Sequence, residues 1–428
     1  MLTSLREFGF SVLRAKTFRQ SGITMVGTIV TGVLGMVFYI FIARSLGPTS
    51  FGSFSVAISV MTIIASFGDV GTNTGLVKFV GKYYRNDDEK AKKFLKLGLE
   101  IKILVWVLVL AIGFPLTSWV GGSLFGKPEL VVPLRIALVG VGGGLLYSYS
   151  AHAVQAVQKF FIWSTVGVSM NVLRLFTMFV LIYLGRLNLY TGIWLYFTFL
   201  LVGFLVGLVF LPKFLFVKGE KKILGEFLKF NKWVAVFTVV SALTARLDML
   251  ITARLLPLEE VGIYSVAVSL SSIVPQIVYS LGIVAAPKLS SFGNNVEALK
   301  YLKKLQIFVV GLAIAGVSIG IPLSRIIIPL FYGAEYSGSI APFAVLLLAQ
   351  AVFLIAVPFH SAILYYFSYP KLFVWITFGQ MVIVGTLGWI LVGIYGAMGV
   401  AIAILVSNLF SFTVPVIWVY SKFTKQTD

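Results

Sequence analysis

The sequence predicts an all-α integral membrane protein of about twelve transmembrane helices, arranged as two parallel six-helix lobes around a central cavity. Hydrophobic residues make up 59% of its 428 residues and charged residues only 11%, which is more apolar surface than one soluble core can hide. Runs of about 20 apolar residues, enough for a helix to cross roughly 30 Å of hydrocarbon, recur along the chain. An internal repeat, described below, supplies the two lobes.

The predicted spans are placed from these apolar runs. They cover residues 22–44, 51–77, 99–120, 130–157, 160–184, 190–212, 233–255, 260–286, 305–331, 340–367, 371–394 and 398–420. The runs are too long and too apolar for membrane strands, which need about 10 residues. The first run has full span length and no clear small-residue cleavage site, so we expect it to remain as a helix and not to be a signal peptide.

The basic residues predict the orientation. Most of the 34 Lys and Arg lie in segments such as 85–96 and 218–232, which are cytoplasmic if both termini are cytoplasmic. Five lie in the predicted external loops or at the external ends of the spans: Arg44, Lys127, Arg186, Arg254 and Arg325. This asymmetry follows the positive-inside rule, and it predicts a multi-pass protein of the cytoplasmic (inner) cell membrane. Anionic lipids of the inner leaflet suffice as partners for the net charge of +19, so no nucleic acid is expected.

Two similar stretches, KFFIWSTVG at 159–167 and KLFVWITFG at 371–379, begin the fifth span of each half. A shift of 210 residues lays ARSLGPTSFGSFSVAIS (43–59) over ARLLPLEEVGIYSVAVS (253–269), with Gly52 over Gly262 among the identities. Six is an even number of spans, so both halves have the same orientation, as in parallel repeats related by an axis along the membrane normal. We predict an N-terminal lobe at 1–216, a basic cytoplasmic linker at 217–232 and a C-terminal lobe at 233–428.

Polar side chains form stripes on the second span of each half. In the first half the stripe consists of Ser55, Ser59, Thr62, Ser66, Asp69 and Asn73, at steps of three and four residues that keep one helical face. The equivalent span carries Ser265, Ser269, Ser272, Gln276 and Tyr279. Further polar residues lie on single faces of the first span (Thr24, Thr28 and Thr31) and of the seventh (Ser241, Thr244, Asp248 and Thr252). We interpret the stripes as the wall of a wet cavity between the lobes. The alternative is that these hydroxyls join helices or bond back to their own carbonyls.

A charged residue at membrane depth suggests a functional role, because burial of a charge in lipid costs several kcal/mol. The acidic residues that we place there are Asp69 and Asp248. Arg174 shares a helical face with Asn171 and Ser164. Arg246 is two residues from Asp248, about 200° around a helix, so the two side chains point apart and cannot pair. Each charge therefore needs a ligand or a partner on another helix. The alternative is a set of interhelical salt bridges that hold the lobes.

Three further ionisable residues have simpler explanations. Arg135, at the external end of its span, is expected to reach the lipid headgroups. His152 shares a face with Ser148 and Gln155, and His360 lies in the equivalent span of the second half. For both histidines a packing role competes with a role in proton coupling. Asp69, Asp248 and His152 are the candidates for coupling.

Several classes of chemistry are excluded or disfavoured. The chain has no cysteine, which excludes disulfides and thiolate metal sites. GVGGG (140–144) lies inside a predicted span, where glycines allow close packing or a kink, and it follows no strand that would make it a nucleotide loop. No Walker motif, metal-binding His/Glu pair or serine elbow is present. We therefore expect neither an enzyme nor a transporter with its own ATPase domain.

The stretch ARSLGPTSFGSFSVAISVMTIIASFGDVGTNTGLVKFVGKY resembles the Wzx-type polysaccharide flippases, with an ALG-like turn after the first span and a D-x-G element before a basic loop. These belong to the multidrug/oligosaccharidyl-lipid/polysaccharide superfamily, with the MATE drug exporters and the lipid II flippases. Two features depart from those relatives: the chain lacks the two extra spans of lipid II flippases, and its acidic residue, Asp69, is in the second span and not in the first as in many MATE exporters.

The resemblance implies transport of a polyprenyl-diphosphate-linked oligosaccharide from the cytoplasmic to the outer leaflet, through a V-shaped cavity that alternates its opening, for cell-surface polysaccharide biosynthesis. It implies as partners the lipid-linked cargo, membrane lipids and polymerase or assembly proteins. It implies no cofactor, and it leaves open a coupling cation, Na⁺ or H⁺.

That cargo suits the polar residues of the spans. Hydroxyl and amide side chains suit the glycan, and arginine, with its planar fork, suits the diphosphate; we expect Arg174 and Arg246 to bind the latter. The candidate substrate-binding residues are Arg174, Arg246, Asp248, Asp69, Asn73, Ser66, Gln276 and Asn171. The alternatives are a MATE-like cation-coupled drug antiporter, a membrane enzyme such as an oligosaccharide polymerase, which the short external loops disfavour, and a scramblase or sensor.

Overall fold

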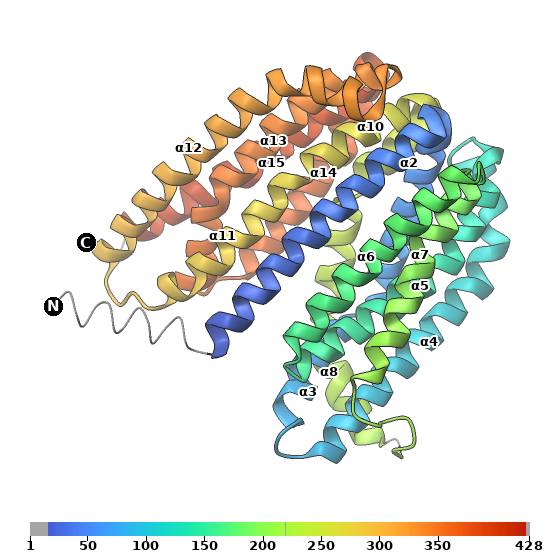
Figure 1. Ribbon diagram of the computed structural model, residues 1–428. Helices are drawn as coiled ribbons and strands as arrows, with labels where there is room; N and C mark the ends of the chain where they lie inside the picture. The colour runs from blue at the N-terminus through green and yellow to red at the C-terminus, as the bar shows by residue number, and fades with distance from the viewer. Residues whose placement is uncertain (1–15, 219, 425–428) are drawn as a thin grey trace. The chain divides into compact units, whose positions relative to one another are not determined.

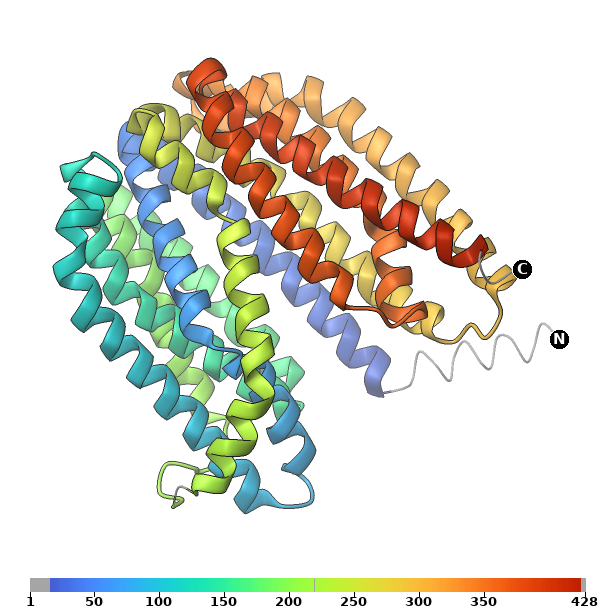
Figure 2. The same ribbon diagram turned by 180° about the vertical axis from the view of Figure 1, so that it is seen from behind.

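The computed structural model describes residues 16–218 and 220–424, and every regular element in them is a helix (Figures 1 and 2). The longer helices of the first part are α2 (Lys16–Asp69), α3 (Thr72–Tyr83), α4 (Asp88–Trp119), α5 (Val131–Ala156), α6 (Phe160–Tyr183) and α7 (Leu189–Val209). They are followed by α8 (Lys221–Thr244), α9 (Leu247–Leu255), α10 (Leu258–Ser271), α11 (Ile273–Ser290), α12 (Asn295–Ile327), α13 (Ile340–Ser361), α14 (Lys371–Tyr395) and α15 (Ala397–Thr424). Short turns of π- or 3-10 helix lie at η1 (Val120–Leu124), η2 (Pro128–Leu130), η3 (Ile328–Tyr332), η4 (Ala334–Ser339) and η5 (Ala362–Tyr366).

The prediction of an all-helical membrane protein is confirmed. Within the described residues, ten helices are long and apolar enough to cross a membrane, or eleven if the bent pair α8 and α9 counts as one span. The predicted number of twelve depends on α2, whose apolar part of 48 residues would be roughly 70 Å long as one helix, about twice the hydrocarbon thickness. At Gly47 the backbone leaves helical geometry (φ 73°, ψ 167°), with Pro48 next to it, and this is where the first two predicted spans separate. Twelve spans, and two lobes around a cavity, stay predictions.

Three predicted spans contain breaks that the apolar pattern does not reveal. The second span is interrupted at Val70 and Gly71, both with positive φ (48° and 73°). The seventh bends by 42° between α8 and α9. The eighth is divided into α10 and α11 at Ser272. Each break frees backbone groups and a helix end at membrane depth, and polar side chains must satisfy them.

Helix α4 begins earlier than the predicted third span. Asp88 and Glu89 occupy its first turn, where carboxylates favour the positive end of the helix dipole. Lys93 pairs with Glu89 at 2.9 Å, one turn on. The basic segment and the apolar run that follows it thus belong to one continuous helix.

The chain divides into two compact units. The first consists of the described parts of Met1–Phe38, Val60–Trp119 and Val131–Val239. Its core is centred on α5, which packs against α3, α4 and α7. Phe79 and Phe94 stack with ring centroids 4.7 Å apart at one end of this core. The predicted lobe boundaries stay predictions.

The glycines of GVGGG serve close packing inside the first unit. A Cβ atom at Gly142 would lie 2.0 Å from Cε2 of Trp106 on α4, and one at Gly140 would lie 2.7 Å from Met61 and Phe197. Helix α5 runs unbroken through the motif. The motif is therefore a packing surface and not a kink.

The second unit consists of Tyr39–Ser59, Val120–Leu130 and the described part of Val240–Asp428. Helix α15 packs along α13 and α14, and α14 and α15 run beside each other in Figure 2. A second apolar core joins α11, α13 and α15 through Leu289, Phe359 and Val419. The second unit thus has a core of its own.

Candidate functional site

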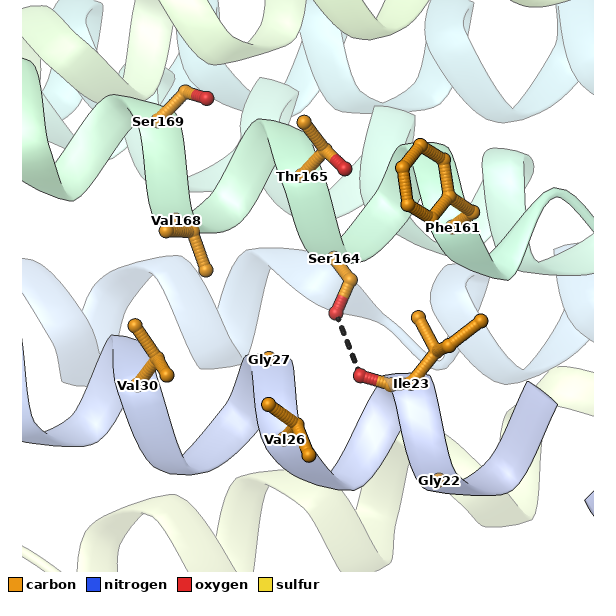
Figure 3. Close-up of a pocket in the computed structure, with 10 residues that line it drawn as sticks. All are labelled: Gly22, Ile23, Val26, Gly27, Val30, Phe161, Ser164, Thr165, Val168 and Ser169. Atoms are coloured by element: carbon orange, nitrogen blue, oxygen red, sulfur yellow. Dashed lines mark hydrogen bonds between the residues drawn. The ribbon is translucent and has the colours of Figure 1, made fainter. Parts of the chain in front are cut away.

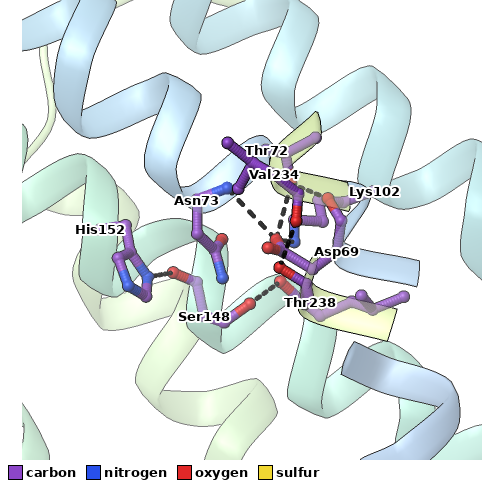
Figure 4. Close-up of polar contacts among 9 residues, drawn as sticks. Asp69, Thr72, Asn73, Lys102, Ser148, His152, Val234 and Thr238 are labelled. Carbon is purple, nitrogen blue, oxygen red and sulfur yellow. Dashed lines mark hydrogen bonds and ion pairs between the residues drawn. The ribbon is translucent and has the colours of Figure 1, made fainter. Parts of the chain in front are cut away.

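Asp69 closes the break between α2 and α3. Its Oδ1 atom accepts hydrogen bonds from Thr72 Oγ1 (2.9 Å) and from the backbone N–H of Asn73 (3.2 Å), in the first turn of α3 (Figure 4). A carboxylate at this position satisfies exposed N–H groups and favours the helix dipole. The positive φ of Val70 and Gly71 turns the chain so that Asp69 can cap the helix that follows it.

Lys102 of α4 is the counter-charge of Asp69. Its side chain is fully buried, and its Nζ atom forms an ion pair and a hydrogen bond with Asp69 Oδ1 (Figure 4). Sequence reasoning did not single out this residue, although 102 lies inside the predicted span 99–120, a few residues after the basic segment 85–96. Asp69 thus has an interhelical ion pair, while a set of salt bridges that holds the lobes and a binding role for Asp69 both stay predictions.

Polar groups around this pair lack hydrogen-bond partners in the described part of the chain. Asn73 Oδ1 is buried and has none, and neither do Oδ1 and Nδ2 of Asn231 on α8, which is 2% exposed. Asn231 faces α3: a Cβ atom at Gly75 would lie 2.7 Å from both of its side-chain polar atoms. His152 lies nearby, with Nδ1 2.7 Å from the carbonyl oxygen of Ser148 (Figure 4).

We call Asp69, Thr72, Asn73, Lys102, Ser148, His152 and Asn231 the polar cluster. Buried polar groups in native proteins are nearly always hydrogen-bonded to protein, water or ligand. Three amide atoms of the polar cluster have no such partner in the described protein. The polar cluster can thus accept water or the hydroxyl groups of a ligand.

Arg174 of α6 lies between aromatic rings. Its guanidinium carbon is 4.3 Å from the ring centroid of Phe38 and 5.3 Å from that of Tyr196. Its Nη2 donates to Asn171 Oδ1 at 2.6 Å, and Asn171 Nδ2 donates to the Gly167 carbonyl at 2.9 Å. Arg174 and Asn171 share a face, as their spacing predicts, and Arg174 is only 8% exposed. Its charge is thus held by aromatic faces and an amide in this structure.

Arg246 and Asp248 lie at the bend between α8 and α9 and do not form a salt bridge with each other. Arg246 is half-buried, and it makes no hydrogen bond or salt bridge within the described residues, although its charge interacts electrostatically with the Asp248 carboxylate. Asp248 is 8% exposed, and its Oδ2 accepts a hydrogen bond from Tyr264 Oη at 2.9 Å. In the described chain no Lys or Arg lies within ion-pair distance of Asp248, so a salt bridge does not account for it.

The other predicted polar residues differ in their surroundings. Hydroxyls of the stripes bond back to carbonyls of their own helices: Thr28 to Thr24 (2.9 Å), Thr244 to Val240 (2.8 Å), Thr252 to Asp248 (3.0 Å) and Ser265 to Val261 (2.7 Å). Ser66 is half-buried and forms no hydrogen bond through its hydroxyl within the described residues, and Gln276 is exposed. The side chain of Tyr279 lies outside the described part. Back-bonding, the alternative explanation of the stripes, thus applies to several of their members.

Arg135 and His360 are held by neighbouring helices. Arg135 donates to Thr117 Oγ1 (3.1 Å) and Ser118 Oγ (3.3 Å) of α4, so two hydroxyls fix it where we expected only headgroups. A ring nitrogen of His360 lies 2.9 Å from the Ser411 carbonyl oxygen. This contact between α13 and α15 fits the packing role.

An apolar groove of about 670 Å³ lies between α2 and α6 (Figure 3). Its walls are Gly22, Ile23, Val26, Gly27, Val30, Phe161, Ser164, Thr165, Val168 and Ser169. Ser164 Oγ donates to the Ile23 carbonyl at 3.1 Å. The approach is close because Gly27 has no side chain: a Cβ atom there would lie 1.7 Å from Ser164 Oγ. The chemistry of this groove suits hydrocarbon.

Comparison with known proteins identifies the family. The model of a family described as polysaccharide biosynthesis protein matches residues 18–292. The succinoglycan biosynthesis transport protein ExoT of Rhizobium meliloti (strain 1021) is 26% identical over 263 residues, which are 58% of this chain and 49% of ExoT. The match therefore spans about half the length of that relative.

Two solved structures share the fold over nearly the whole chain. One is an inward-facing multidrug resistance MATE family transporter of the MOP superfamily (TM-score 0.77, 16% identity, covering 92% of this chain and 95% of that one). The other is the lipid II flippase MurJ in an inward closed conformation (TM-score 0.76, 17% identity, covering 94% and 89%). The chain belongs to the polysaccharide biosynthesis protein family, and its fold is that of the MOP-superfamily membrane proteins of known structure.

Proposed function

We propose that this protein is a transporter that moves a polyprenyl-diphosphate-linked oligosaccharide from the cytoplasmic to the outer leaflet by alternating access, with both termini in the cytoplasm. The family, whose description is polysaccharide biosynthesis, supports a saccharide cargo, and the name of ExoT supports export of a polysaccharide or its precursor. The observation that carries the proposal is Arg246, a half-buried residue at a helix break whose guanidinium makes no hydrogen bond or salt bridge within the described residues, although its charge interacts electrostatically with Asp248. A guanidinium at membrane depth that has no hydrogen-bonded anion can bind one from a ligand, and its planar fork fits a phosphate.

The other parts of the cargo match other parts of the chain. The unpartnered amides of Asn73 and Asn231 suit sugar hydroxyls, which both donate and accept hydrogen bonds. The prenyl chain remains in lipid, and the groove between α2 and α6 offers it an apolar surface. Arg174, packed on aromatic rings, contributes to the diphosphate site only if it leaves them.

The two candidate coupling carboxylates have different surroundings. Lys102 already neutralises Asp69, so a cation at Asp69 would have to displace an ammonium group. Asp248 has a tyrosine as its side-chain partner and can bind H⁺ or Na⁺ without losing an ion pair. We therefore assign coupling to Asp248. The same observation supports the second candidate function, a cation-coupled antiporter of small molecules.

Variants of Arg246 test the diphosphate site. In proteoliposomes that hold a polyprenyl-diphosphate saccharide, we expect Arg246→Ala to slow flipping by roughly tenfold or more, because a charge-assisted hydrogen bond is worth about 1.5–3 kcal/mol. Arg246→Lys should keep part of the rate, since the charge remains and the fork is lost. Arg186→Ala is the matched control, because Arg186 is exposed on a loop. Equal rates for the two alanine variants would remove Arg246 from the site.

A further inference from the structure

The two sequence repeats meet each other at a pair of equivalent glycines. Gly52 of α2 and Gly262 of α10 are 210 residues apart and align in the repeat. A Cβ atom at Gly52 would lie 1.9 Å from the Leu258 carbonyl oxygen and 3.0 Å from Gly262 N. A Cβ atom at Gly262 would lie 1.9 Å from the Pro48 carbonyl oxygen and 3.0 Å from Gly52 N. Pro48 and Leu258 are also 210 residues apart, so the contact is symmetric, and a local two-fold axis passes between the glycines.

Two equivalent arginines repeat this symmetry. Arg44, from the first repeat, donates to the Leu330 carbonyl in η3 of the second repeat at 2.9 Å. Arg254, its equivalent 210 residues on, donates to the Ser123 carbonyl in η1 of the first repeat at 3.3 Å. Turns η1 and η3 directly follow α4 and α12, the helices that contain the third predicted span of each half. The arginine of each repeat thus donates a hydrogen bond to the turn after the equivalent helix of the other repeat.

A third pair of contacts has the same pattern. The Ala43 carbonyl accepts a hydrogen bond from Tyr336 Oη at 2.7 Å, and the carbonyl of its equivalent, Ala253, accepts one from Lys127 Nζ. Both donors lie a few residues after the π-helical turn of the opposite repeat. Three independent contacts thus obey one symmetry.

The contact is dry at its centre and wet at its rim. One turn from the glycines, Ser55 and its equivalent Ser265 are 6% and 5% exposed, and Val56 and Val266 are fully buried. Arg44 and Arg254 are exposed. Glycines let the backbones touch without interlocking side chains, and exposed hydrogen bonds contribute little net free energy each. Such a contact closes tightly and can still separate at low cost.

We propose that Gly52, Gly262, Arg44 and Arg254 form the outer gate of the transporter. The gate rests on the proposed alternating access, since a closed contact between the repeats at the predicted external end must open to release cargo outward. The glycine crossing is the seal, and the arginines set how readily it opens. The four residues are gating residues and need not touch the cargo.

A cysteine probe tests the gate directly. The chain has no cysteine, and Ser55→Cys puts a thiol of nearly the same size on a buried site whose hydroxyl has no hydrogen-bond partner among the described residues. We expect a membrane-impermeant maleimide to label it slowly. Adding Gly52→Ala should speed labelling by roughly tenfold or more, because a methyl group 1.9 Å from a backbone oxygen forces the helices apart. Gly35→Ala is the control on the same helix, where a Cβ atom meets nothing within 4 Å. Equal labelling in both backgrounds would overturn the gate.

A second variant covers the case in which Gly52→Ala fails to fold. Arg44→Gln combined with Arg254→Gln keeps the glycine crossing and removes both guanidinium groups, and it should speed labelling several-fold. Unchanged labelling would count against the gate. Labelling uses no cargo, so its outcome is distinct from that of the proposed function. If labelling responds but no lipid-linked saccharide is flipped, the gate stands and the cargo assignment fails. If flipping occurs but labelling responds to neither variant, only the gate fails.

Discussion

Replacing Lys102 by methionine leaves the Asp69 carboxylate in the membrane interior without its counter-charge. The Lys102 side chain is fully buried and that of Asp69 is 13% exposed. Removing one member of a buried ion pair costs about 3–5 kcal/mol. The partial exposure of Asp69 favours the lower end, and we expect a loss of about 3 kcal/mol.

Thermal unfolding in detergent measures this loss. Domains of about 150–250 residues lose about 2–4 °C of Tm per kcal/mol. At that rate Lys102→Met should lower Tm by roughly 6–12 °C. The double variant Asp69→Asn with Lys102→Met should recover most of it, since no buried charge remains and asparagine also caps helices well. A single variant as stable as the wild type, or a double variant no better than the single one, would refute the assignment of Lys102 as the counter-charge.

Three further substitutions give separate expectations. Gly142→Ala should lower Tm, because overpacking against Trp106 costs about 1–3 kcal/mol of stability. Gly144→Ala should change Tm little, since a Cβ atom there would lie 3.4 Å from Cβ of Ala65. Equal effects would contradict the packing of GVGGG. Tyr264→Phe removes the hydrogen bond to Asp248 and should cost about 1–3 kcal/mol and alter the cation dependence of transport; an unchanged cation dependence would argue against coupling at Asp248. Burial lowers the pKa of Lys127 below its ordinary value of 10.5, so the unfolded chain binds the proton more tightly, and this lysine's contribution to stability should rise with pH from its lowered pKa to 10.5. Over that pH range, the Tm of Lys127→Met should rise less than that of the wild type. Identical pH profiles of Tm would contradict this contribution of Lys127.

The sequence predicts the repeat well, because symmetry leaves identities at fixed spacing. Gly52 aligns with Gly262 by sequence alone, and the structure brings the two into contact. The alignment could not tell that they touch, since it relates equivalent positions and not neighbouring ones. A glycine shared by both repeats within an apolar helix is nevertheless the kind of signal that close helix packing leaves.

The break in the second span could have been inferred from the same stretch that carries the family resemblance. In the D-x-G element, Asp69 caps α3 and Gly71 adopts positive φ, both common choices for a helix start and a left-handed residue. Hydropathy hides the break, because Val70 and the residues around it are apolar enough for a continuous span.

The charges of the site were predicted only in part, because their partners depend on tertiary structure. Asp69 stands out on the polar stripe, but Lys102 lies next to a basic segment, and its burial depends on packing between α2 and α4. Likewise, the face shared by Arg174 and Asn171 follows from helical spacing, whereas the rings of Phe38 and Tyr196 come from other helices. Helical periodicity identifies a face, and it does not identify what that face meets.

The most direct test of the central claim is flipping by the purified wild-type protein. Proteoliposomes would carry a polyprenyl-diphosphate saccharide with a labelled sugar, and a membrane-impermeant enzyme would modify only the label that faces outward. We expect a protein-dependent loss of protection of the labelled sugar. We expect no protein-dependent uptake of a soluble cationic drug under a proton or sodium gradient. No flipping across several glycans, together with gradient-driven drug uptake, would contradict the flippase assignment and support the antiporter.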